Sequence, residues 1–73
     1  MKAIMIYPGH ELWPVWCNKT YPEYNYTVVL FSENADEQEP PIDFVDTYTE
    51  MAARTVLDAV NLGIITDWRQ LYG

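Results

Sequence analysis

Cysteine and glycine are scarce in this chain of 73 residues, which has one cysteine and three glycines. Because Cys17 is alone, no disulfide can form within the chain, and a zinc site built from several cysteines is excluded. A lone cysteine fits a protein of a reducing compartment. The glycines are scattered at positions 9, 63 and 73, so the chain lacks a glycine-rich phosphate-binding loop. We therefore expect one domain, residues 1–73, without metal or other cofactor.

Long apolar runs are also absent. The apolar stretch that begins at Met1 is interrupted at Tyr7, Pro8 and Gly9, which leaves it too short for a signal peptide. No stretch approaches the ~20 apolar residues of a membrane-spanning helix. These observations predict a cytoplasmic protein.

Basic residues are few, and the acidic excess is concentrated in one region. Four lysines and arginines stand against eleven acids, which gives a formal net charge of −7. Residues 33–50 contain no lysine or arginine, and their acids are Glu33, Asp36, Glu37, Glu39, Asp43, Asp46 and Glu50. Such a region repels nucleic acid and anionic membranes and attracts basic protein surfaces. The simpler interpretation is a solvated loop and helix N-terminus, where acids favour the helix dipole.

Aromatic residues, by contrast, are abundant at 15% of the chain. Each one buries roughly 150–250 Å² when it enters a core, so a domain of this size can fold on them. Five rings gather in the N-terminal half among prolines: Trp13, Trp16, Tyr21, Tyr24 and Tyr26. Tryptophan and tyrosine are also the residues most enriched at binding hot spots. The rings therefore have two open interpretations, as core or as a binding surface.

Three segments have strand-like patterns. The apolar run Ala3–Tyr7 ends at the turn pair Pro8-Gly9 and predicts a first strand. Glu11–Cys17 is a candidate second strand, restricted to a sheet edge because Pro14 cannot donate a hydrogen bond. Tyr24–Phe31 is the clearest strand, with β-branched and aromatic side chains throughout. If the first or third of these strands is unpaired on one side, a partner strand could add to it.

A polar, acidic segment at 32–41 follows and predicts a mobile loop. After it comes a helix that we expect to begin between Pro41 and Thr47, since Thr47 and Glu50 match a capping box. Its expected buried stripe has the 3–4 spacing of an amphipathic helix and consists of Val45, Tyr48, Ala52, Val56, Ala59 and Leu62.

Gly63 predicts the end of this helix, and Thr66–Leu71 predicts a short second one. Because the strands come first and the helix last, the expected class is α+β. The expected architecture is a small two- or three-stranded antiparallel sheet packed against one C-terminal helix.

Catalysis has little support in the sequence. His10 and Cys17 are the only candidates for a base and nucleophile, and no third group is placed to orient the base. Carboxylate catalysis needs one acid in an apolar pocket, whereas the acids of 33–50 are crowded and solvated. The spacing of a calcium-binding EF-hand is absent. We therefore expect a binding protein, not an enzyme.

The run Tyr26–Glu37 is a strand that opens directly into acids, and one amphipathic helix follows it. This layout, with the chain length and the aromatic N-terminal half, resembles small phage-encoded transcription regulators that bind host RNA polymerase, such as those of lytic Xanthomonas phages. The resemblance implies action in the host cytoplasm, binding to the large polymerase subunits, inhibition of initiation and effects on termination, including antitermination. It covers size and charge layout only, so no interface residue is taken from it.

The leading hypothesis is therefore a phage-type protein that binds basic surfaces of host RNA polymerase and touches neither nucleic acid nor membrane. On the charge and aromatic patterns, the expected partner-binding residues are Trp13, Trp16, Tyr24, Tyr26, Glu33, Asp36, Glu37 and Glu39. The alternative is an acidic nucleic-acid mimic that inhibits a host DNA-binding or defence enzyme. Mimicry needs carboxylates at phosphate-like separations on a rigid element, and four of the seven acids precede Pro41 on the expected loop. A third possibility is an accessory or structural module that self-associates.

Overall fold

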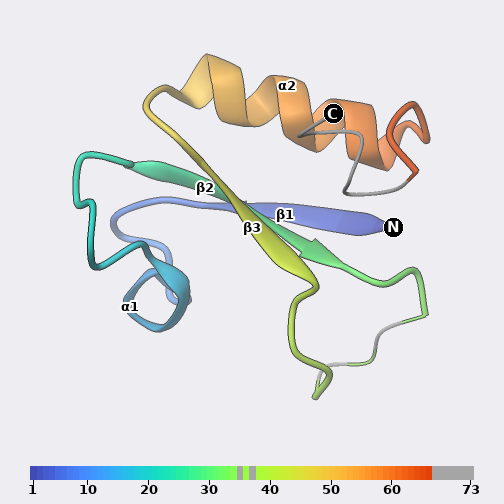
Figure 1. Cartoon of the computed structure of the whole chain (residues 1–73), viewed down its shortest axis with the longest axis horizontal. Helices are drawn as coiled ribbons and strands as arrows, with labels where there is room; N and C mark the ends of the chain where they lie inside the picture. Colours follow the sequence, from blue (N-terminus) through green and yellow to red (C-terminus); the bar gives the residue numbers. More distant parts are fainter. Residues whose placement is uncertain (35, 37, 67–73) are drawn as a thin grey trace.

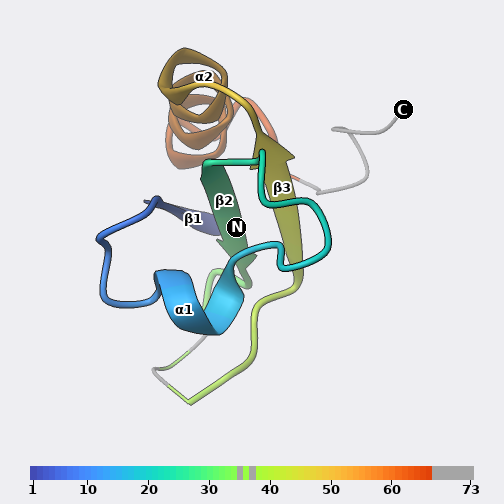
Figure 2. The same cartoon turned by 90° about the vertical axis from the view of Figure 1, so that its left-hand side faces the viewer.

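A three-stranded antiparallel sheet lies between a long helix on one face and a short helix on the other (Figures 1 and 2). In this computed structural model, residues 1–34, 36 and 38–66 are described. The elements, in chain order, are β1 (Lys2–Ile6), α1 (Trp13–Trp16), β2 (Tyr26–Phe31), β3 (Asp43–Thr47) and α2 (Glu50–Asn61). The predicted α+β class is confirmed, with three strands in the sheet.

β2 is the central strand, so its backbone is paired on both sides. Val28 lies opposite Met5 of β1 and opposite Val45 of β3. The residues from Thr27 to Leu30 are all fully buried. Branched apolar side chains suit this position, because a strand covered on both faces has no solvent-facing side. Strand addition at Tyr24–Phe31 is thereby excluded, and β1 and β3 form the two edges of the sheet.

The face of the sheet that contacts α2 contains the main hydrophobic core. Alternation along the strands sends Ala3, Val28 and Leu30 to this face, where they pack against Ala53 and Val60 of α2. Tyr26, Val45, Val56 and other half-buried side chains surround this cluster. Each fully buried valine or leucine contributes roughly 1.5–3 kcal/mol relative to an exposed one.

The stripe of α2 that faces the sheet differs from the predicted one. Ala53 and Val60 are buried and Val56 and Leu57 half-buried, whereas Ala52 and Leu62 are exposed. Val45 and Tyr48 of the predicted stripe precede the helix, so the spacing that continues from them selects the wrong face of α2.

Val45 lies in β3 and Tyr48 follows this strand, so the predicted start of the helix between Pro41 and Thr47 is wrong. Asp43–Thr47 pairs with β2, and its two apolar residues point to opposite faces of the sheet: Val45 packs against the core below α2, and Phe44 lines a hollow with residues of α1. α2 begins at Glu50, and its N-cap is Thr49, whose Oγ1 accepts a hydrogen bond of 3.1 Å from the Ala52 N–H. The hydroxyl of Thr47 instead donates to the Tyr26 carbonyl.

The expected strand at Glu11–Cys17 is also wrong, because α1 occupies its centre. Pro14 lies in the first turn of α1, where a missing N–H costs nothing, since first-turn amides have no partner within a helix. The proline that restricted a strand to the sheet edge thus favours a helical turn.

Gly63 ends α2 as predicted, with φ of +80°. The Gly63 N–H donates to the Val60 carbonyl and the Ile64 N–H to the Ala59 carbonyl, the pair of bonds that closes a helix with a left-handed residue. The predicted helix at Thr66–Leu71 falls almost wholly outside the described residues. In the described part of the chain, no helix has the length and apolar character needed to cross a membrane.

Candidate functional site

The connection from β1 to β2 carries α1 across the sheet face opposite α2 (Figure 2). A tight turn at Gly9, with φ of +101°, reverses the chain after β1. His10 holds this turn, because its N–H donates to the Tyr7 carbonyl and its Nδ1 accepts from the Leu12 N–H. His10 therefore has a local structural role in the turn that leads to α1.

Trp16 joins α1 to the sheet. Its ring packs edge-on against Phe31 at the end of β2, with 5.7 Å between ring centroids and 62° between ring planes. Trp16 is half-buried and lines two hollows, one beside β1 and one beside β3. The structure thus places this member of the predicted aromatic set at two concave surfaces.

The larger hollow, beside β1, has a volume of about 730 Å³. Its residues come from five parts of the fold, which are β1, the α1 segment, β2, the loop after β2 and α2: Lys2, Ala3, Ile4, Glu11, Leu12, Trp16, Phe31, Asp36 and Asn61. Because Ala3 faces α2 while Phe31 faces α1, the hollow passes around the outer edge of β1. Its apolar wall is formed by Leu12, Trp16 and Phe31, and its charged lining residues, all exposed, are Lys2, Glu11 and Asp36. We call this site the β1 groove.

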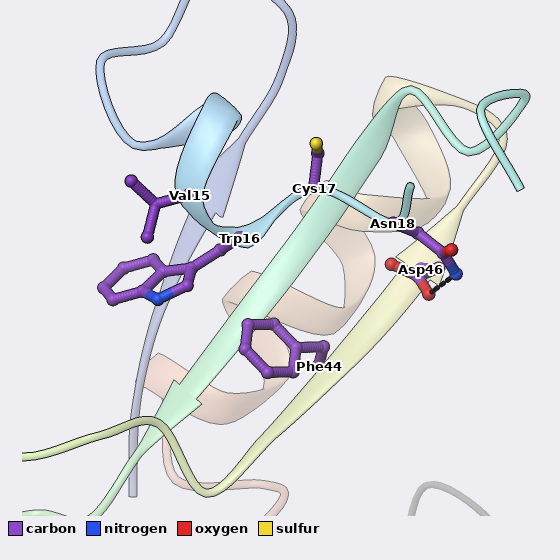
Figure 3. Close-up of a pocket in the computed structure, with 6 residues that line it drawn as sticks. All are labelled: Val15, Trp16, Cys17, Asn18, Phe44 and Asp46. Atoms are coloured by element: carbon purple, nitrogen blue, oxygen red, sulfur yellow. Dashed lines mark hydrogen bonds between the residues drawn. The ribbon is translucent and has the colours of Figure 1, made fainter. Parts of the chain in front are cut away.

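The smaller hollow, beside β3, has a volume of about 310 Å³ and is shown in Figure 3. Val15, Trp16 and Phe44 give it an apolar side, while Cys17, Asn18 and Asp46 line the rest. Asp46 accepts hydrogen bonds from Asn18 Nδ2 at 2.7 Å and from Thr27 Oγ1 at 2.8 Å. Both carboxylate oxygens of Asp46 are therefore engaged within the fold. The acid of this hollow is less available to a ligand than the acids of the β1 groove.

The outer edge of β1 contacts one side chain of α2. Asn61 Oδ1 accepts a hydrogen bond of 3.3 Å from the Ala3 N–H, and Asn61 Nδ2 donates to the Ala3 carbonyl at 3.5 Å. A carboxamide thus occupies the place that a neighbouring peptide group would take. Residues 3 and 61 are 58 positions apart, so local sequence patterns gave no sign of this contact.

Three of the four predicted acidic residues of the loop are described, and all three lie on the surface. Glu33, Asp36 and Glu39 are exposed, and Glu37 lies outside the described residues. Described residues of 32–41 belong to no helix or strand. Asp36 Oδ1 accepts from the N–H groups of Gln38 and Glu39, which shapes the chain locally. Glu33 is 83% exposed and lies 4.0 Å from the N-terminal ammonium group. Of the loop acids that the structure describes, Asp36 lines the β1 groove.

The later acids of the stretch are engaged within the fold, which narrows the predicted acidic surface. Glu50 Oε1 accepts from Arg54 at 2.7 Å across one helical turn, and this contact raises the pKa of the Arg54 guanidinium. Asp43 Oδ1 accepts from the Phe44 N–H at 2.7 Å. Among the described acids of 33–50, the exposed ones are then Glu33, Asp36 and Glu39 of the loop and Glu50, which is paired with Arg54.

The predicted tyrosines do not join the tryptophans in one cluster. Tyr26 packs against the α2 core, which favours the core interpretation for this residue. Tyr24 lies 4.5 Å from Tyr48 between ring centroids, and Tyr21 packs edge-on against Tyr24. The hydroxyl of Tyr48, by a hydrogen bond and then by its charge when ionised, raises the pKa of Tyr24.

The remaining tryptophan, Trp13, is half-buried in α1. The structure therefore brings together Trp16 and Asp36 of the predicted set and adds Glu11, Leu12 and Phe31, which sequence patterns did not single out. No sequence pattern links these residues, because Glu11 and Leu12 precede α1 whereas Phe31 ends β2. They meet only when α1 folds onto the sheet.

Metal ligands and nucleophiles do not converge in the described part of the chain. Within it, no three or more histidine, cysteine or acidic side chains are arranged to hold a metal ion. Cys17 is a half-buried free thiol. The chemistry that the β1 groove offers is apolar contact, negative charge and a strand edge.

Searches for related proteins returned no matching family model, no matching curated protein and no matching solved structure.

Proposed function

We propose that this domain binds a basic surface of another protein through the β1 groove and thereby regulates that protein. The partner we propose is host RNA polymerase, in the host cytoplasm, with inhibition of transcription initiation and an effect on termination as the outcome. Binding, not catalysis, is the proposed activity.

The observation that carries this proposal is the pairing of aromatic and acidic side chains at one concave site. Trp16 and Phe31 supply an apolar wall, and Glu11 and Asp36 lie at its margin. Aromatic anchors in a pocket with a charged rim are the arrangement that concentrates binding energy in protein interfaces. Because the acids outnumber the single lysine of the groove, a basic partner is favoured.

Two steps of association follow from this arrangement. The exposed loop acids and the net charge of −7 attract a basic surface and raise the association rate. The aromatic wall then excludes water from the contact, which slows dissociation. Regulation results when the occupied polymerase surface is one that a transcription factor also needs.

The test is direct binding of purified bacterial RNA polymerase to the immobilised chain, followed by promoter-dependent transcription in its presence. We expect retention that weakens with salt, and reduced initiation. Trp16→Ala should weaken binding by about 30-fold, corresponding to ~2 kcal/mol for a hot-spot residue. A folded domain that fails to retain any polymerase at low salt would falsify the choice of partner.

Val15→Ala is the matched control, because Val15 is the neighbour of Trp16 on α1 but lines only the smaller hollow. It should leave polymerase binding within about twofold, as expected for a position outside the hot spot. Equal losses for the two variants would move the site to the hollow beside β3. Displacement of the bound partner by duplex DNA would favour the alternative function, nucleic-acid mimicry.

A further inference from the structure

We infer that the β1 groove takes an extended basic segment of its partner as an added strand on the outer edge of β1, in place of the Asn61 side chain. This inference rests on the proposed function and specifies how the partner is recognised.

The backbone of β1 supplies the first argument. In an antiparallel pair, alternate residues direct both N–H and C=O to the same neighbour. Ala3 directs both groups to Asn61, away from β2, so Met5, two residues on, directs its groups to the same outer side. β1 therefore presents an edge on which a partner strand can form backbone hydrogen bonds.

A partner strand can displace the Asn61 side chain from its contact with Ala3. Its carboxamide offers one donor and one acceptor, as a peptide group does, and so covers the edge at Ala3. Its bonds of 3.3 and 3.5 Å are longer than the usual ~2.9 Å for N–H···O, so a strand with shorter bonds can compete. Asn61 is the last residue of α2, where the side chain can turn away without disturbing the helix interior.

The groove next to this edge indicates the chemistry of the occupant. Side chains of an added strand alternate between the two faces of the sheet. Those that enter the groove meet Leu12, Trp16 and Phe31 with acids at the margin, Glu11 and Asp36. An occupant with apolar side chains toward Leu12, Trp16 and Phe31, and with lysine or arginine within reach of the two acids, satisfies both parts of this surface.

The other sheet edge and a second copy of the chain fit less well. At the β3 edge, the Phe44 N–H already donates to Asp43 Oδ1 at 2.7 Å, and Asp46 follows two residues after Phe44. Charged side chains along an edge are a common protection against strand addition. Pairing of two β1 edges would bring together two chains that each have a net charge of −7, which repulsion disfavours.

The probe is a fluorescent seven-residue peptide of alternating lysine and valine, measured by fluorescence anisotropy and by amide hydrogen exchange of the full chain. We expect binding and slower exchange at the Met5 amide, with exchange in the interior of α2 unchanged. A peptide of the same sequence, with alternate backbone nitrogens methylated along the edge that faces β1, keeps its charge but loses these bonds. It should bind at least about tenfold more weakly, since two hydrogen bonds are lost.

Asn61→Ala provides a test from the side of the protein. Removing the competing carboxamide should strengthen peptide binding by about fivefold, the equivalent of one net hydrogen bond. Asn25→Ala, an exposed asparagine before β2, is the matched control and should bind like the unchanged chain. Unchanged or weaker peptide binding by a folded Asn61→Ala chain would overturn the role given to Asn61.

The remaining outcomes separate this inference from the proposed function. If both peptides bind equally and Met5 exchange is unchanged, strand addition is wrong, while charge-driven binding of a partner stands. If a glutamate–valine peptide binds as well as the lysine–valine peptide, the basic occupant is wrong. If Met5 is already protected in a dimer seen by sedimentation, self-pairing replaces the inference. Polymerase retention, measured separately, decides the proposed function in every case.

Discussion

Asn18 and Asp46 are joined by a hydrogen bond of 2.7 Å, although 28 positions separate them in the chain. The bond ties the end of the α1 segment to β3, across the sheet face opposite α2. Asn18 cannot reverse its amide freely, because its Oδ1 accepts from the N–H groups of Thr20 and Tyr21. The other oxygen of Asp46 accepts from the buried Thr27 hydroxyl. Asp46 is thus part of the framework that holds α1 over the sheet.

We predict that Asp46→Asn destabilises the fold by about 1.5–3 kcal/mol, the range for losing a hydrogen bond to a charged group. The new amide has one oxygen in place of two, so it can no longer accept from both Asn18 Nδ2 and the Thr27 hydroxyl. Urea unfolding followed by circular dichroism measures the change. Asp58→Asn, the same chemical change at an exposed position of α2, should alter stability by less than ~0.5 kcal/mol. Equal effects at the two positions would contradict the framework role of Asp46.

Thr49, not Thr47, caps α2, and a substitution distinguishes the two. Thr49→Ala removes the hydroxyl that accepts from the Ala52 N–H and should cost about 1 kcal/mol in the free energy of unfolding. Thr49→Ser keeps an oxygen in the same place and should retain most of the stability. Thermal or urea unfolding of both variants is the measurement. A serine variant as unstable as the alanine variant would argue against side-chain capping.

The raised pKa of Tyr24 predicts a loss of stability in alkali. The ordinary value is 10.0, and the hydrogen bond with Tyr48, in which the neutral Tyr24 phenol is the donor, favours the protonated form in the folded state. The contribution of this contact is therefore fully present below pH ~10 and is lost as pH rises through the higher pKa of the folded state. Tyr48→Phe removes the two largest causes, so the pKa of Tyr24 should fall toward its ordinary value.

Proton resonances of the Tyr24 ring, followed as pH is raised, report this pKa directly. The unfolding free energy of the unchanged chain should also fall more steeply above pH ~10 than that of Tyr48→Phe. Coincident titrations of Tyr24 in the two proteins would show that Tyr48 does not set its pKa.

The acidic loop predicts an effect on the rate of association. Asp36→Asn with Glu39→Gln removes two charges and keeps oxygen acceptors, and it should slow association with a basic partner by severalfold and flatten its salt dependence. Asp58→Asn with Glu23→Gln removes the same charge at exposed positions elsewhere and is the matched control. Stopped-flow mixing with the basic peptide probe gives both rates. An equal slowing by the two double variants would mean that net charge, and not the loop, attracts the partner.

Local pattern was sufficient for several elements of this protein. The strands at β1 and β2 differ from the predicted ones by one or two residues at their ends, because their β-branched and aromatic side chains suit a sheet in any context. Gly63 ended the helix as expected, since a left-handed residue is a local requirement. The α+β class followed from the order of these segments.

Tertiary contacts determined the structure of the segments whose local sequence pattern was ambiguous or predicted the wrong element. Asp43–Thr47 had an acceptable helical spacing but became a strand, because it pairs with the open side of β2. Pro14 is compatible with a helix start and with a sheet edge, and the packing of Trp16 on Phe31 accompanies the helical outcome.

The sequence by itself determined the composition of the surface: an acidic excess, a wealth of aromatic rings and strands that must form a sheet. The tertiary structure alone decided which of these groups meet, placing Trp16 and Asp36 at one groove and Asn61 on the edge of β1. The physical reason is that side-chain burial and backbone pairing depend on neighbours distant in the chain, and no local periodicity encodes their identity.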